Sequence, residues 1–102
     1  MSNEEMIVMD IIMTAGEAKA YMYEALSKAK EGKFEEIGNL IEKAEDELEK
    51  AHNVQTSLLT KEASGENVNL SMLFIHSQDH LMTCISEKNL IEEIIELRRE
   101  MK

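Results

Sequence analysis

The chain has 102 residues, which suits a single domain, and its formal net charge at pH 7 is −10. That acidity argues against nucleic-acid binding, because a surface that holds phosphates needs an excess of Lys and Arg. It also disfavours adhesion to anionic lipid, and no apolar run approaches the ~20 residues that cross a bilayer. The only cysteine, Cys84, has no intramolecular partner, so a reducing compartment fits best. We therefore expect one cytoplasmic domain spanning residues 1–102.

The composition predicts an all-α fold, because strong helix formers dominate and the chain has no Pro. Two glycines, Gly32 and Gly65, stand where helices are expected to stop. The predicted helices span about 4–30, 34–63 and 68–101. Since the two links between them are short, neighbouring helices should run antiparallel and form an up-down-up three-helix bundle.

The first two predicted helices each carry an apolar stripe with alternating spacings of three and four residues, and the first half of the first helix is apolar around most of its circumference. Such a stripe marks the side of a helix that packs in a core. In the first helix it comprises Val8, Ile11, Ala15, Ala18, Met22, Ala25 and Ala29. In the second helix, where Gln55 is the polar exception, it comprises Phe34, Ile37, Ile41, Ala44, Leu48, Ala51, Gln55 and Leu58.

The third predicted helix carries two apolar faces, of which a monomeric bundle can bury only one. The pattern therefore predicts a homo-oligomer. Asp79 lies in the middle of the second face, where carboxylates from several copies would meet and repel unless a divalent cation or a shared proton relieved them. The first face holds Leu70, Leu73, Phe74, Leu81, Cys84 and Ile85, and the second holds Met72, Ile75, Met82, Leu90 and Leu97.

Two histidines, His76 and His80, lie along the seam between these two faces. His76 and His80 are one helical turn apart, and Gln78 and Asp79 stand between them. Imidazole exchanges protons and accepts groups near neutral pH, so the segment indicates proton transfer, metal binding or covalent transfer through histidine. A catalytic zinc site is disfavoured, because the Glu of a His-Glu-x-x-His motif and further Cys or His ligands are missing.

Four stretches of the chain resemble one known family, the enzyme IIA component of the lactose/cellobiose (diacetylchitobiose) branch of the bacterial phosphoenolpyruvate-dependent sugar phosphotransferase system. The likeness extends over essentially the whole chain. Its most specific part is the histidine segment, in which the family usually has alanine at the position of Ser77. The stretches are IMTAGEA (12–18), AKEGKFEE (29–36), EKAHNVQT (49–56) and HSQDHLM (76–82).

The resemblance implies a cytoplasmic homotrimer of three-helix subunits, with nine helices in all. It implies that His76 takes a phosphoryl group from HPr and passes it to a cysteine of enzyme IIB, while enzyme IIC in the membrane imports a β-linked disaccharide. His80 and Gln78 are expected to support the transfer by hydrogen bonding. Asp79 is expected to meet its two symmetry mates around a divalent metal ion, magnesium.

Two other functions remain open on the residues alone. The first is a non-catalytic helical adaptor whose histidines fill a subunit interface. The second is a two-component phosphotransfer domain, which is also helical with one reactive histidine. That second class usually has four helices and a basic residue soon after the histidine, whereas this chain has Gln78 and Asp79 there.

Overall fold

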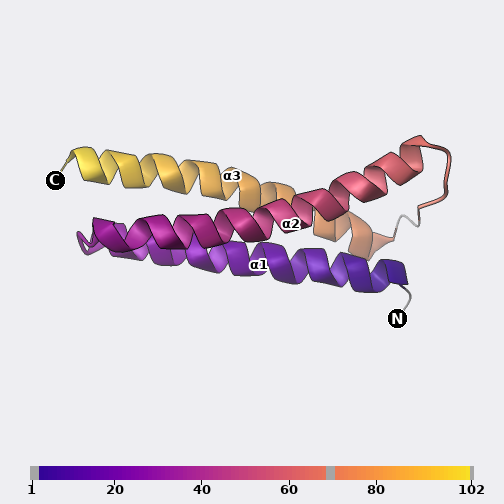
Figure 1. Cartoon of the computed structure of the whole chain (residues 1–102), viewed down its shortest axis with the longest axis horizontal. Coiled ribbons are helices and arrows are strands. Elements are labelled where there is room, and N and C mark those ends of the chain that lie inside the picture. Colours follow the sequence, from indigo (N-terminus) through magenta and orange to yellow (C-terminus); the bar gives the residue numbers. More distant parts are fainter. Residues whose placement is uncertain (1–2, 69–70, 102) are drawn as a thin grey trace.

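Three helices make up the computed structural model, which describes residues 3–68 and 71–101 (Figure 1). α1 spans Asn3–Lys30, α2 spans Ile37–Ala63 and α3 spans Met72–Glu100, and a short 3-10 turn, η1, spans Phe34–Glu36. Successive helices run in opposite directions, and no strand occurs in the described ranges. The predicted all-α, antiparallel, up-down-up bundle is therefore confirmed.

Both predicted glycine stops end a helix. Gly32 and Gly65 have positive φ angles of 78° and 93°, which a glycine adopts at little steric cost. After α1, the N–H of Lys33 donates to the carbonyl of Lys28 at 2.9 Å, and the same six-residue closure follows α2. These turns satisfy carbonyls that the helix ends would otherwise leave free.

The start of the third helix was predicted four residues too early. Residue 68 is not helical, residues 69–70 lie outside the described ranges, and α3 begins at Met72. Ser71 has an extended backbone, and its hydroxyl accepts the N–H of Phe74 at 3.0 Å. This side-chain cap defines the first turn of α3. The predicted start follows from Gly65, which ends the preceding helix, and takes no account of Ser71, which caps α3.

The second helix also begins later than predicted. Residues 34–36 form η1, in which the N–H of Glu36 donates to the carbonyl of Lys33 at 3.2 Å. The chain therefore leaves the glycine turn through a tighter helical turn before the α-helical hydrogen bonds of α2 begin.

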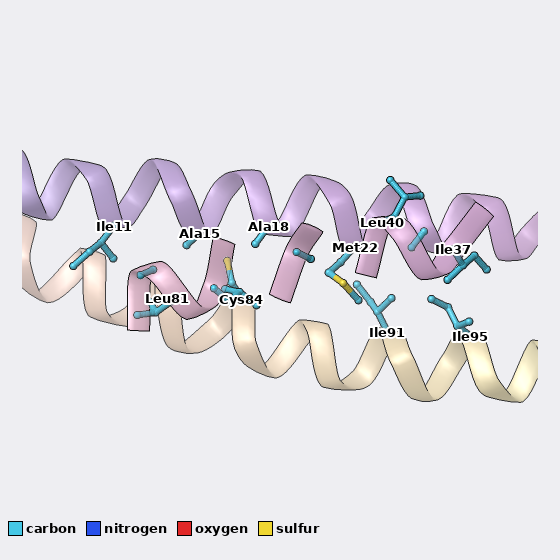
Figure 2. Packing of buried hydrophobic residues seen from close by; sticks show 14 of the residues in the cluster. Ile11, Ala15, Ala18, Met22, Ile37, Leu40, Leu81, Cys84, Ile91 and Ile95 are labelled. Carbon is cyan, nitrogen blue, oxygen red and sulfur yellow. The ribbon is translucent and has the colours of Figure 1, made fainter. Parts of the chain in front are cut away.

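The core forms around α1, which packs along both other helices, whereas α2 and α3 contact each other much less. All seven predicted stripe residues of α1 are buried. Ala15 and Ala18 face Leu81 and Cys84 of α3, and their small side chains let the two helices approach closely (Figure 2). Burial raises the pKa of the Cys84 thiol.

The predicted core stripes of α2 and α3 differ from the observed ones at several positions. On α2, Leu40 is buried while Ile41 is only half-buried, because the stripe shifts by one residue near the helix start, and Phe34, which belongs to η1, is also half-buried. On α3, the stripe continues beyond Lys88 into two further buried isoleucines, and it also includes a buried serine. Two members of the predicted face are only half-buried, and a third, Leu70, lies outside the described residues. The additional buried residues of α3 are Ser77, Ile91 and Ile95, and the half-buried ones are Leu73 and Ile85.

The later part of the α3 stripe was not predicted, because the charged residue Lys88 interrupts the apolar pattern at a position next to the core. Its side chain is 15% exposed, and its ammonium lies 2.8 Å from a Glu92 carboxylate oxygen and 3.4 Å from one of Glu45. Burial alone would lower the pKa of Lys88, but these two carboxylates outweigh it and the pKa is raised. The aliphatic stem covers apolar surface while the charged end is paired.

Candidate functional site

His76 and His80 lie in the second and third turns of α3, on the edge that faces α1. Their rings are nearly parallel, with an angle of 11° between the planes and 6.2 Å between the centroids. His76 is exposed and His80 is half-buried. His76 is thus accessible to another protein, while His80, one turn further along α3, is less exposed.

His80 approaches α1 at Gly16. A Cβ atom built on this glycine would lie 3.9 Å from Nε2 of His80. A side chain at this position of α1 would therefore contact the imidazole.

Two turns beyond His80, the same edge carries a polar network that sequence reasoning missed. The hydroxyl of Tyr23 donates to a carboxylate oxygen of Glu87 at 2.6 Å, and Nζ of Lys19 lies 3.5 Å from the other. The hydrogen bond from Tyr23 is the main cause of a lowered Glu87 pKa, with further help from Lys19 and His80. The same bond raises the pKa of Tyr23. The charges beside the histidines thus come partly from α1.

Replacing Tyr23 by phenylalanine should raise the pKa of Glu87 toward its ordinary value. A carboxyl group whose pKa is lowered in the folded state stabilises the fold above its unfolded pKa, near 4.3, and loses that contribution as the pH falls through the folded value. The variant should therefore melt slightly below the wild type at pH 7, and the difference should disappear as the pH falls below the lowered pKa of Glu87. Carboxyl ¹³C titration and thermal melts measure both effects. Tyr21→Phe is the matched control, and an unchanged Glu87 titration in Tyr23→Phe would contradict the assignment.

Gln78 lies on the opposite edge of α3 from the histidine pair and turns toward α2. Its Oε1 accepts a hydrogen bond from Nε2 of Gln55, the polar exception in the α2 stripe, which is 8% exposed. Nε2 of Gln78 is buried without a hydrogen-bond partner in the described part of the chain. Within one subunit, the structure does not bring Gln78 to His76.

Asp79 lies on the second apolar face of α3, which is exposed in the single chain. Its side chain is exposed, and its backbone carbonyl accepts a hydrogen bond from the Thr83 hydroxyl. Across residues 3–68 and 71–101, no three or more His, Cys, Asp and Glu side chains gather closely enough to hold a metal ion. The exposed fractions of the apolar residues are 87% for Met72, 58% for Ile75, 54% for Met82, 61% for Leu90 and 58% for Leu97.

Ser77, beside the first histidine, belongs to the core. It is fully buried, and its hydroxyl donates to the carbonyl of Phe74 at 2.7 Å. Because this bond satisfies the hydroxyl inside the helix, a serine fits a position that alanine would fill.

None of the described helices combines the length and apolar character needed to cross a membrane.

Comparison with known proteins gives a consistent result. Residues 6–99 match the family described as PTS system, Lactose/Cellobiose specific IIA subunit. The chain is 41% identical over 96 residues to the PTS system galactose-specific EIIA component of Lactococcus lactis subsp. cremoris, covering 94% of this chain and 83% of that protein.

Two solved structures resemble the bundle. The PTS cellobiose-specific enzyme IIA from Bacillus anthracis superposes with a TM-score of 0.95 at 40% identity, covering 99% of this chain and 93% of that one. A chain from the IIA(Chitobiose)–HPr complex of the N,N'-diacetylchitobiose branch of the Escherichia coli phosphotransferase system superposes with a TM-score of 0.81 at 32% identity, covering 99% and 98%. The three proteins are named for three different sugars.

Proposed function

This chain belongs to the lactose/cellobiose-specific IIA family of the sugar phosphotransferase system, whose members carry phosphoryl groups in sugar transport, and from that premise we propose that His76 is the phosphoryl acceptor. The donor is HPr, the acceptor is a cysteine of enzyme IIB, and enzyme IIC in the membrane imports a β-linked disaccharide. The carrier works in the cytoplasm. The main supporting observation is the exposed His76 ring in front of the half-buried, parallel ring of His80.

The transfer consists of two balanced displacements. A neutral imidazole nitrogen of His76 attacks phosphorus, a new N–P bond forms, and the N–P bond of phosphohistidine on HPr breaks with its electron pair returning to HPr. A thiolate of enzyme IIB then attacks the phosphorus on His76, and the electron pair of that N–P bond returns to His76. No oxidant is consumed. The protein positions the group and stabilises its charge.

His80 and Gln78 take different parts in this proposal. His80 can donate a hydrogen bond from behind His76 to a phosphoryl oxygen. Gln78 faces α2 and its partner Gln55, so its amide can serve only a phosphoryl group that another subunit carries. We therefore assign the support within one subunit to His80.

The exposed apolar face of α3 supports a homo-oligomer, and the trimer, with nine helices, is the working form that the family resemblance implies. Five large apolar side chains on one helix face, each more than half exposed, are better covered by further copies than by water. Asp79 stands in that face, so three symmetry-related carboxylates would meet at the trimer axis. Carboxylate oxygens suit Mg²⁺, which would neutralise their mutual repulsion when bound there.

Removing that metal should lower the melting temperature, because three like charges would then remain in a poorly hydrated space. Asp79→Leu should abolish the response to a chelator and should leave the melting temperature equal or higher, since apolar replacement of buried charge is often neutral or stabilising. Phosphoryl uptake should fall only modestly. Thermal melts with EDTA and with added Mg²⁺ measure this.

The exposed α2 residue Asp46 provides the control, because Asp46→Leu should keep the chelator response. A wild-type melting temperature that neither EDTA nor Mg²⁺ moves would contradict the axial metal. Loss of phosphorylation in a well-folded Asp79→Leu trimer would instead place Asp79 in the transfer chemistry.

Labelling tests the function itself. The chain is incubated with radiolabelled phosphoenolpyruvate, enzyme I and HPr, and should acquire a phosphoryl group that is labile in acid and stable in base, as a phosphoramidate is. An acid-stable adduct would indicate a serine or threonine. A folded chain that acquires no label would favour the alternative function, an oligomeric adaptor with interface histidines.

A further inference from the structure

We propose that Gly16 is a positioning residue for phosphoryl transfer, because the space it leaves on α1 places the imidazole of His80 behind His76. The inference rests on the proposed role of His76. It extends the site from one helix to two, because α1 then determines where the supporting histidine of α3 stands.

Gly16 occupies an unfavourable position for a glycine. It lies in the interior of α1, where glycine is less favourable than alanine because it loses more backbone freedom on folding. Gly32 and Gly65 are explained by their positive φ angles, which Gly16 does not share. Gly38 lies in the first turn of α2, and a Cβ built on it meets nothing within 4 Å in the described part of the chain.

The surroundings of Gly16 limit how large a side chain this position accepts. Among the residues that the structure describes, and apart from the local backbone and the two chain neighbours, the one atom within 4 Å of a Cβ built there is Nε2 of His80, at 3.9 Å. A methyl group at this distance makes ordinary van der Waals contact, so alanine fits. A branched side chain extends further and must push the imidazole away from α1. His80 would then move relative to His76, whose nearly parallel ring lies 6.2 Å away between centroids.

The size of the effect has an upper limit. If Gly16 acts only by placing His80, the worst substitution at Gly16 cannot slow transfer more than removal of the His80 imidazole does. Loss of one hydrogen bond to a charged group corresponds to roughly a ten- to hundredfold reduction in rate. Transfer in Gly16→Val should therefore slow by up to that factor.

The experiment measures the rate of phosphoryl uptake from phospho-HPr in five variants. Gly16→Ala, which brings only a methyl group into ordinary contact with the imidazole, should transfer faster than Gly16→Val and melt at a higher temperature than the wild type. Gly16→Val should transfer slowly, whereas Gly38→Val, the matched control for a β-branched residue in place of a helical glycine, should not. In a His80→Gln background, Gly16→Val should cause no further loss. NMR signals of the His80 ring should shift in Gly16→Val and stay in place in Gly38→Val.

Several results would overturn the inference. A wild-type rate in folded Gly16→Val would do so, as would a loss of the same size in the presence and absence of His80. If Gly16→Val does not fold, Gly16→Ser adds one atom beyond the methyl and should give a smaller loss that again disappears in the His80→Gln background. Labelling of His76→Gln separates the two proposals, because full labelling there refutes the acceptor assignment whatever Gly16 does.

Discussion

Replacing His76 by glutamine should abolish phosphoryl uptake from phospho-HPr while the chain keeps its helicity and its assembly. Glutamine has no ring nitrogen that can attack phosphorus, and the exposed His76 side chain contributes little to the core. His80→Gln should slow uptake roughly ten- to hundredfold, the effect of one lost hydrogen bond to a charged group. Autoradiography of the labelled chain, with circular dichroism and sedimentation on the same samples, measures these outcomes.

His52 provides the control for this experiment. It is the third histidine, exposed on α2, where it lines a cavity of about 300 Å³ between α2 and α3 with Leu48 and Ile85. Because that cavity faces away from the α1 edge of α3, His52→Gln should keep most of the uptake. Full labelling of His76→Gln would show that another residue accepts the phosphoryl group.

Replacing Met82 by aspartate should convert the assembled protein into monomers or unfolded chain. Met82 is 54% exposed in the single chain and lies beside Asp79 on the exposed face of α3. In a trimer the substitution would bring three more carboxylates into an apolar contact, and burying an unpaired charge is costly. Even truncation of a large buried side chain costs about 2–5 kcal/mol, and symmetry repeats the loss at each equivalent contact.

Sedimentation velocity at micromolar concentration measures the assembly. Leu59→Asp is the matched control, because Leu59 is 53% exposed but lies on α2, away from that face. It should sediment as the wild type does. A wild type that sediments as a monomer at this concentration would contradict the two-face argument and, with it, the proposed axial metal.

The features that local sequence determines were predictable. The three helices and their order follow from helix-forming composition, and the ends of α1 and α2 follow from Gly32 and Gly65, whose positive φ angles are a property of single residues. The stripe of α1 was correct at all seven positions, because a helix repeats every 3.6 residues whatever lies opposite. The same helical repeat predicted the second apolar face of α3, and that face is exposed in the single chain.

The features that depend on how one helix is rotated against another were not predictable. The turn of Gln78 toward Gln55, the approach of His80 to Gly16, and the bond between Tyr23 and Glu87 each join residues from different helices. Helical periodicity gives the face of each side chain but not the neighbour that meets it. Side-chain packing between the helices selects that neighbour. Sequence therefore identified the histidine pair, and helical periodicity alone puts Gln78 on another face of α3. Tertiary packing gave Gln78 its partner Gln55 and placed α1 beside the histidines.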